Sequence, residues 1–222
     1  MFSSSVSKGG YKALILDFVG VLTKGVRESL QSWCVVQGLH HKAWGSTLNL
    51  HPEGRRLYLE LEAGRLTQQE WNRLTAPLLG VDEHENLMGR AWGEVRPAHD
   101  MIELARSARS ADLKTALLSN SFGLDPYNPY RTLGVSDLCE VTVLSELEGV
   151  AKPDPEIYRR TLDRLGVPGE KCVFVDDNPA NLVPAQELGI TTVLADGRKD
   201  LVEHVAKLLN IHSRSRDDLG AQ

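Results

Sequence analysis

Asp17 stands directly after the apolar run 13–16 and three residues before Gly20, where the chain can turn. In an open α/β sheet, ligands bind outside the carboxyl ends of the strands, so a carboxylate at that point faces a crevice and not the core. A carboxylate in such a crevice can attack an electrophilic atom such as phosphorus and form a covalent intermediate. We therefore expect Asp17 to be a nucleophile held at the edge of a sheet.

Three further segments place polar groups next to apolar runs or helix starts. Ser119 and Asn120 end one apolar run, and Asp176 and Asp177 end another. Lys152 stands before a Pro-Asp-Pro sequence that is typical of a helix start. Each segment taken alone has a structural alternative as a turn, a surface charge or a helix cap. Four chemically complementary groups in succession are not expected from capping alone, so the set favours a catalytic site.

In this order, the four segments resemble the motifs of the haloacid dehalogenase (HAD) superfamily, most of whose members are magnesium-dependent phosphatases. The resemblance covers nearly the whole chain, and the ordered set is far more specific than any single motif. It departs at one position, because the family's phosphatases usually have Asp-x-Asp-Gly where this chain has Asp17-Phe18-Val19-Gly20. In the family, the second aspartate protonates the leaving oxygen and later deprotonates the attacking water.

The resemblance implies phosphate chemistry for the first three segments. Asp17 would attack phosphorus and form an aspartyl-phosphate, which water then hydrolyses. Lys152 would pair with Asp17 and with the phosphoryl oxygens, since an anionic nucleophile and an anionic substrate repel each other. The hydroxyl of Ser119 and the backbone amides of Phe18 and Asn120 would complete the phosphate site.

The resemblance also implies a magnesium site. Mg²⁺ prefers carboxylate and carbonyl oxygens together with water and phosphate. Asp17, the backbone carbonyl of Val19, and Asp177 would supply these ligands, with Asp176 nearby. A side-chain change at position 19 leaves that carbonyl in place. Asn181 would orient the acidic loop from behind.

Val19 leaves several alternatives open. The protein could hydrolyse phosphates whose leaving groups need little protonation, or take its acid from the cap or the substrate. Phosphonate cleavage would require a lysine in the cap, where Lys24 and Lys42 are available. Haloacid dehalogenation needs no metal, and the paired Asp176 and Asp177 argue against it. A non-catalytic module that binds a phosphorylated ligand or a protein is the fourth alternative, although the retained nucleophile, lysine and acidic pair favour the first.

Composition narrows the choice of partners. The 222 residues carry a formal net charge of −5, with 41% hydrophobic and 25% charged residues, as in ordinary globular proteins. The absence of long basic runs argues against nucleic acid or an anionic membrane as partner, so we expect a small phosphorylated metabolite and a monomer or homodimer. No segment resembles a signal sequence or a membrane span, which predicts a cytoplasmic protein. Three cysteines without metal-ligand spacing favour reduced thiols: Cys34, Cys139 and Cys172.

Apolar strand-like runs alternate with helical patterns over most of the chain. The expected strands are 13–16, 115–118, 141–144, 173–175 and 191–194. This alternation predicts an α/β fold with a Rossmann-like, doubly wound parallel sheet. Stripes of 3.6-residue period within 98–108 and 201–209 should pack on the sheet faces. A further helix should begin after its N-cap Asp154, with Pro155 at the first position, and end at Gly166.

The segment 24–95 breaks this rhythm and has helical patterns throughout, as in HAD members whose cap follows the first motif. We predict a core of residues 11–23 and 96–212, a helical cap of 24–95, and flexible tails at 1–10 and 213–222. The cap would close over the nucleophile.

Inside the expected cap, Thr67 and Glu70 form a capping-box pattern that predicts a helix start. Core packing is favoured over a specificity pocket for the four tryptophans, Trp33, Trp44, Trp71 and Trp92. Six basic residues could contact anionic groups of a substrate, with solvated surface as the alternative: His40, His41, Lys42, Arg55, Arg56 and Arg65.

Overall fold

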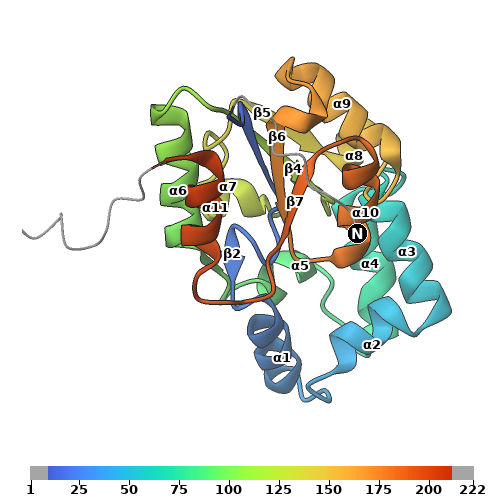
Figure 1. The fold of residues 1–222 in the computed structure, drawn as a ribbon. Coiled ribbons are helices and arrows are strands. Elements are labelled where there is room, and N and C mark those ends of the chain that lie inside the picture. The colour runs from blue at the N-terminus through green and yellow to red at the C-terminus, as the bar shows by residue number, and fades with distance from the viewer. Residues whose placement is uncertain (1–9, 212–222) are drawn as a thin grey trace, which may run out of the picture.

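The computed structural model describes residues 10–211, so the expected tails, apart from Gly10, lie outside the described residues. A five-stranded parallel sheet forms the centre of the protein, in the order β5-β4-β1-β6-β7, with helices on both faces (Figure 1). This arrangement confirms the predicted α/β, doubly wound fold. The strands are β1 (Ala13–Leu16), β4 (Lys114–Ser119), β5 (Val141–Leu144), β6 (Cys172–Asp176) and β7 (Thr191–Leu194).

The central strand β1 is buried on both faces, which explains its unbroken apolar sequence. Successive side chains of a strand point to opposite faces. Leu14 and Leu16 accordingly belong to one apolar cluster, and Ala13 and Ile15 belong to the other. The first cluster is covered by α6 (His99–Ser110) and α11 (Leu201–Leu209), and the second by α9 (Pro155–Leu165) and α10 (Pro179–Glu187) (Figure 1).

Helix ends follow the sequence signals closely. The side-chain oxygen of Thr67 accepts a hydrogen bond from the backbone amide of Glu70 at 3.1 Å, and the Glu70 carboxylate accepts one from the Thr67 amide at 2.9 Å. Asp154 accepts from the amide of Glu156 at 2.9 Å, and α9 ends at Gly166 with φ +61°. Both predicted helix starts are therefore confirmed.

The chain between β1 and α6 leaves the sheet through a short antiparallel pair, β2 (Thr23–Lys24) and β3 (Arg96–Pro97). These two-residue strands were not anticipated, because they are too short to show a period. The helices between them are α1 (Val26–Val36), α2 (Ala43–Asn49), α3 (Pro52–Glu62), α4 (Gln68–Leu79) and α5 (Leu87–Ala91). We refer to this helical segment as the cap.

Aromatic side chains fill the interior of the cap. The rings of Trp33 and Trp44 lie 5.4 Å apart, and those of Trp44 and Trp71 lie 5.8 Å apart. Trp92 contacts Phe122 of the core at 4.7 Å. All four tryptophans are buried, so the structure favours packing as their main role, and aromatic contacts also join the cap to the core.

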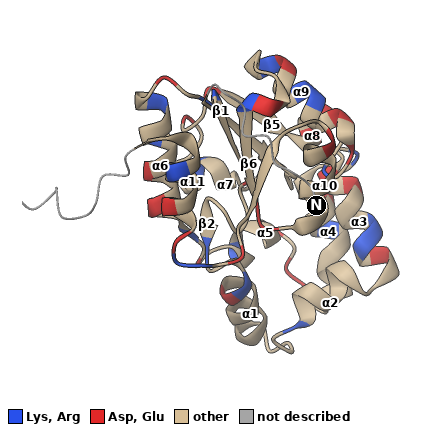
Figure 2. Ribbon diagram, in the orientation of Figure 1, with Lys and Arg blue, Asp and Glu red and all other residues tan. Residues whose placement is uncertain are grey.

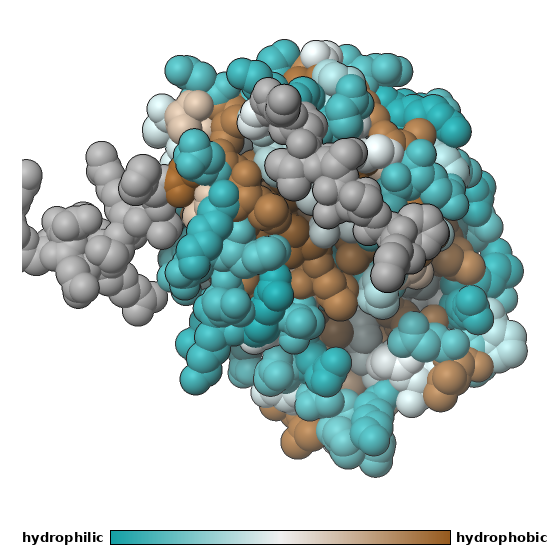
Figure 3. All heavy atoms as spheres, viewed as in Figure 1, coloured by the Kyte–Doolittle hydropathy of each residue, from teal (hydrophilic) through white to brown (hydrophobic). Residues whose placement is uncertain are grey.

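Three shorter elements complete the fold: α7 (Pro129–Thr132), α8 (Ser145–Glu148) and the 3-10 helix η1 (Gly169–Lys171). Acidic and basic residues lie side by side on the outer helices α3, α6 and α9 (Figure 2). Figure 3 shows hydrophobic residues gathered along the middle of the same face, between hydrophilic surfaces. Within residues 10–211, no helix has the length and apolar character needed to cross a bilayer.

Candidate active site

Three carboxylates meet at the carboxyl ends of β1 and β6. Asp17 follows β1, Asp176 is the last residue of β6, and Asp177 comes next. One carboxylate oxygen of each lies within 4.8 Å of the others. The two strands are neighbours in the parallel sheet, so their ends meet at the same edge. The structure thus brings together two acidic segments whose first aspartates, Asp17 and Asp176, lie 159 positions apart in the sequence.

Lys152 lies between two of these carboxylates. Its Nζ is 2.7 Å from Oδ1 of Asp17 and 2.6 Å from Oδ2 of Asp176, and it donates to the carbonyl oxygen of Leu118 at 3.0 Å. The side chain is 1% exposed, so this ammonium is desolvated and depends on these partners. The side chain of Asn120 makes two hydrogen bonds to the Lys152 backbone. Its Oδ1 accepts from the Lys152 amide at 2.8 Å, and its Nδ2 donates to the Lys152 carbonyl oxygen at 2.9 Å.

The first carboxylate of the acidic pair, Asp176, is fully buried and fully engaged. Nδ2 of Asn181 lies 3.1 Å from each of its oxygens, and the backbone amide of Asn178 donates to Oδ1 at 2.8 Å. Lys152 also binds Oδ2 of Asp176. Together these contacts fix the carboxylate in place. It therefore serves to hold the lysine and the acidic loop.

The second carboxylate, Asp177, is exposed and lies against the turn after Asp17. A Cβ on Gly20, whose φ is +74°, would come within 2.3 Å of its Oδ2. Glycine at this position therefore permits both the left-handed backbone and the close approach of the carboxylate. Burial and the charge of Asp176 raise the pKa of Asp177, against the opposing effect of Lys152.

Burial dominates the electrostatics of the pair formed by Asp17 and Lys152. Burial raises the pKa of Asp17, while the Lys152 ammonium lowers it and the Asp176 carboxylate raises it further. Burial also works against the charge of Lys152, but the two carboxylates outweigh it and raise its pKa above the ordinary value. The lysine is therefore an ammonium ion throughout the neutral pH range.

The donor set fits a hard divalent cation. Three carboxyl groups and one ammonium meet at one edge of the sheet, where loop 17–20 turns away from β1. Such oxygen-rich, anionic clusters suit Mg²⁺. Asp17 and Asp177 are the carboxylates with oxygen atoms still available, because Asp176 is engaged on both of its oxygens.

The expected phosphate contacts lie beside this cluster. Ser119 is fully buried at the end of β4, and its Oγ accepts from the hydroxyl of Tyr130 at 3.0 Å. The Tyr130 ring in turn lies 4.4 Å from that of Phe18. Tyr130 was not identified from the sequence, since nothing in its local pattern links it to Ser119. Val19 is half-buried and packs against the apolar cluster shared by core and cap.

The six basic candidates of the cap divide between its surface and a cavity within it. Arg56 and Arg65 pair on the surface with glutamates of the same helical region, each at 2.7 Å, and Arg55 is exposed. His41 and Lys42 line a cap cavity of about 640 Å³ beside Trp44 and Tyr58. The His40 ring lies 4.3 Å from that of its neighbour His41.

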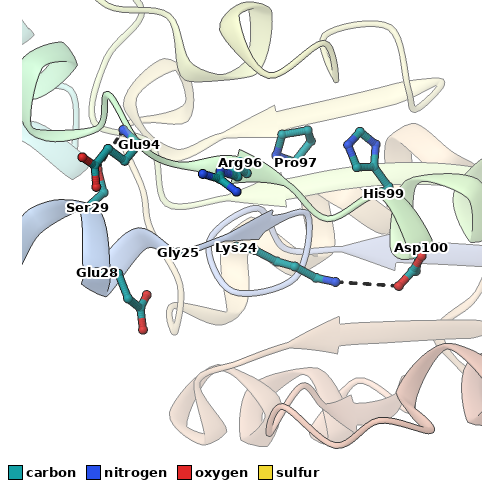
Figure 4. Close-up of a pocket in the computed structure, with 9 residues that line it drawn as sticks. All are labelled: Lys24, Gly25, Glu28, Ser29, Glu94, Arg96, Pro97, His99 and Asp100. Carbon is teal, nitrogen blue, oxygen red and sulfur yellow. Dashed lines mark hydrogen bonds and ion pairs between the residues drawn. The ribbon is translucent and has the colours of Figure 1, made fainter.

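A pocket of about 600 Å³ lies at the β2–β3 pair, where the chain passes between core and cap. Its lining is mixed in charge, with Lys24, Arg96 and His99 beside Glu28 and other acids (Figure 4). Lys24 reaches a carboxylate oxygen of Asp100 at 3.7 Å. This lysine is therefore directed to the junction and not to the carboxylate cluster.

Gln68, the first residue of α4, connects the cap to the core. The sequence predicted only that a helix starts here. Gln68 is 1% exposed, and its Nε2 donates to the carbonyl oxygens of Phe122 and Tyr127, both at 3.0 Å. Its Oε1 accepts from the Tyr127 amide at 2.9 Å. These bonds attach the start of α4 to the loop that follows β4, at the edge of the sheet that holds the carboxylates.

Two more cap residues near the site, Tyr58 and Glu62, were not predicted from the sequence. Tyr58 and Glu62 are one turn apart on α3, and the charges of Asp17 and Lys152 act on Glu62. Their spacing of four places them on one helix face. That spacing is the only signal in the sequence, and it is too common to identify a site.

Comparison with known proteins gives a consistent picture. A family model described as haloacid dehalogenase-like hydrolase matches residues 11–189. D-ribitol-5-phosphate phosphatase from Bacteroides thetaiotaomicron is 25% identical over 211 residues, covering 90% of this chain and 98% of that protein. A crystal structure of a HAD family enzyme from the same organism, in complex with magnesium and inorganic phosphate, superposes with a TM-score of 0.65 at 27% identity. That match covers 83% of this chain and 94% of the other.

A longer relative shares only part of its sequence with this chain. Acyl-CoA dehydrogenase family member 10 from Mus musculus is 35% identical over 109 residues, which are 49% of this chain and 10% of that protein. The chain spans less than a third of the length of the first curated relatives. The match therefore concerns one region of those larger proteins.

Proposed function

The chain belongs to the haloacid dehalogenase-like hydrolase family, and we propose that it is a magnesium-dependent phosphohydrolase acting on a small phosphorylated metabolite. The observation that carries this proposal is the buried Lys152 ammonium, which lies between the carboxylates of Asp17 and Asp176 at the carboxyl ends of β1 and β6. A buried cation that bridges the nucleophile and a second, fully engaged carboxylate suits attack on an anionic substrate.

In the proposed reaction, Asp17 attacks phosphorus and forms an aspartyl-phosphate, which water hydrolyses in a second step. The Lys152 ammonium opposes the effect of burial, which still raises the pKa of Asp17 to about 7, so the ionised nucleophile is well populated at neutral pH and above. The same ammonium offers positive charge to the phosphoryl oxygens. Asn120 and Asp176 hold the lysine at this point through its backbone and its Nζ.

Mg²⁺ would be held by Asp17, Asp177 and the carbonyl of Val19, and would supply positive charge to the phosphoryl oxygens. Asp176 and Asn181 would keep the acidic loop in place. The magnesium complex of the related Bacteroides thetaiotaomicron enzyme supports this assignment.

Ser119 and the backbone amides of Phe18 and Asn120 would bind the phosphoryl oxygens. Since Tyr130 donates its own proton to Oγ of Ser119, the serine hydroxyl is free to donate to a ligand. The weak 3.4 Å contact of that hydroxyl with the carbonyl of Asn120 is easily replaced.

The alternatives have less support. Phosphonate cleavage through a Schiff base would need a cap lysine at the nucleophile, but Lys24 is directed to Asp100 at the core–cap junction and Lys42 lines the cap cavity. Haloacid dehalogenation gives no role to the accessible Asp177 beside Gly20. A non-catalytic phosphate-binding module is the remaining competitor, on account of Val19.

A phosphate-release screen over sugar, acyl, nucleotide and lipid phosphates tests the proposal. The wild-type protein should release inorganic phosphate from at least one class with Mg²⁺, and should be inactive in excess chelator. Asp17→Asn is the control for contaminating phosphatases, because asparagine is near-isosteric and cannot attack as a carboxylate does. Silence over the whole panel, together with binding of inorganic phosphate, would favour the non-catalytic module. Chelator-resistant halide release from 2-chloropropionate would favour dehalogenation.

A further inference from the structure

Val19 removes from loop 17–20 the carboxyl group that would protonate a leaving oxygen. Its side chain is half-buried and packs against apolar neighbours, so it offers no proton and no route for one. General acid–base catalysis of this kind contributes about 10²–10⁴-fold in rate. An ester with a poor leaving group therefore needs a proton donor from another part of the molecule, and the cap carries carboxyl groups close to the site.

Glu62 is the last residue of α3, and the turn that follows it is fixed to the core. Gly64, with φ +68°, lies so close to the core that a Cβ there would be 2.1 Å from the carbonyl oxygen of Glu146. Gln68 then binds the loop after β4. Helix α3 also contacts α8, which begins where β5 ends. The C-terminal end of α3 is thus held over the carboxyl ends of β4 and β5.

The surroundings of Glu62 include the groups proposed to react. The Lys152 ammonium and the Asp17 carboxylate both act on the charge of Glu62, and Tyr58 stands one turn earlier on the same helix face. Burial has the largest effect and raises the pKa of Glu62 to about 7; Lys152 opposes this rise and Asp17 adds to it. At neutral pH, this carboxyl group can therefore both hold and release a proton.

Other carboxylates of α3 and of the core lack this combination. Glu53 and Glu60, on the same helix as Glu62, are paired with arginines that lower their pKa. Glu146 is close to the core loop, but its pKa responds to burial and to Ser121. Glu62 combines partial burial, a fixed helix end and the nearby charges of the nucleophile and the lysine.

We propose that Glu62 is the acid–base group of this enzyme and supplies from the cap the function that the missing carboxyl group at position 19 would perform. This inference rests on the proposed phosphohydrolase function. In the first step, an Asp17 oxygen bonds to phosphorus, the bond from phosphorus to the ester oxygen breaks, and the leaving oxygen takes the proton of Glu62. In the second step, Glu62 takes a proton from water as the water oxygen bonds to phosphorus and the Asp17–phosphorus bond breaks. Both side chains return to their starting states.

The test uses a series of aryl phosphates from 4-nitrophenyl phosphate, with a good leaving group, to phenyl phosphate, with a poor one. The kcat/KM reports the first step, in which the leaving group departs. Glu62→Gln should lower kcat/KM about 100-fold on phenyl phosphate and less than about threefold on 4-nitrophenyl phosphate. Because the second step also slows, Glu62→Gln should show a rapid burst of 4-nitrophenolate followed by slow turnover.

Two matched variants separate this role from a structural one. Glu53→Gln makes the same change two to three turns earlier on α3 and should leave both substrates unaffected. Adding Val19→Asp to Glu62→Gln should restore at least about tenfold of kcat/KM on phenyl phosphate and little on 4-nitrophenyl phosphate. Circular dichroism of each variant establishes that it is folded.

The outcomes are distinct. An equal loss of kcat/KM on all aryl phosphates, or no loss, would overturn the role of Glu62 and leave the phosphohydrolase proposal standing. A wild-type protein that hydrolyses none of these esters with Mg²⁺ would overturn the proposed function, and the inference with it.

Discussion

The core and the cap bring polar groups to the same edge of the sheet by different physical means. In the core, Lys152 and Asp176 are fully buried, and each is held by several hydrogen bonds or ion pairs. In the cap, Tyr58 and Glu62 are half-buried on a helix that is positioned by aromatic packing and by a few contacts of the α3–α4 turn. The core network therefore couples stability to function, whereas the cap can vary its polar groups at little structural cost.

Replacing Lys152 in the core should have the largest effect on both stability and turnover. Lys152→Met would leave the buried carboxylates of Asp17 and Asp176 without their cation, and breaking a buried ion pair costs about 3–5 kcal/mol of the free energy of unfolding. Since Lys152 lowers the pKa of Asp17, its loss should also favour the protonated, non-nucleophilic acid. We expect turnover to fall by about 10⁴-fold or more.

Urea denaturation and phosphate release measure the two effects. The loss of stability should be larger at pH 8 than at pH 5, because protonation at low pH removes the unpaired charges. Lys12→Met, on the exposed approach to β1, is the matched control and should change neither quantity. A stable and active Lys152→Met protein would contradict the central place of the lysine.

Replacing Asp177 should mainly affect activation by Mg²⁺, whereas replacing Asp176 should mainly affect stability. Asp177→Ala should raise the Mg²⁺ concentration needed for half-maximal activity by about 100-fold or more. It should not change the free energy of unfolding, since this carboxylate is exposed. Asp176→Ala should lower the free energy of unfolding by about 3 kcal/mol, because Lys152 and Asn181 lose a buried partner. Mg²⁺ titrations of activity and denaturation curves distinguish them. The reverse assignment of effects would show that Asp176 is the metal-binding carboxylate.

The difference between core and cap also explains what the sequence could predict. All five strands of the sheet were found, because a buried parallel strand has an unbroken apolar run and a polar residue at its end. Asp17, Ser119 and Asp176 follow such runs directly, so their meeting at one edge follows from the fold. Lys152 could be placed only through its motif, since it follows no strand.

The cap residues could not be predicted in this way. Gln68, Glu62 and Tyr58 lie on helices whose sequence fixes which face is apolar but not which part of the core that face will meet. Likewise, Tyr130 reaches Ser119 from a four-residue helix without a measurable period. Positions that depend on how two helical or loop segments dock have no local signature in a single sequence.

The attachment of the cap gives a smaller expected effect. Gln68→Ala would remove four hydrogen-bonding contacts to the loop that contains Phe122 and Tyr127. Leaving buried backbone groups unsatisfied should lower the free energy of unfolding by about 3 kcal/mol, and kcat/KM should fall because the α3–α4 turn is no longer held. Gln69→Ala removes the same side chain from the next, exposed position and is the control. Equal stability of the two variants would show that aromatic packing alone attaches the cap.

The smallest expected effect is a gain of stability at Glu62. Burial raises the pKa of this carboxyl group from 4.5 to about 7 in the folded protein, so ionisation favours the unfolded state. Asp17, whose pKa is also raised to about 7, makes both proteins lose stability as the pH rises, but the wild-type protein should lose more than Glu62→Gln between about pH 4.5 and 7. At pH 8 the variant should be more stable by about 2 kcal/mol, with little difference at pH 4.5. Denaturation curves at both pH values test this, with Glu53→Gln as the control that should show no such gain. If the difference in the free energy of unfolding between wild type and Glu62→Gln is the same at both pH values, Glu62 has an ordinary pKa. Its carboxyl group would then be solvated like that of any surface helix.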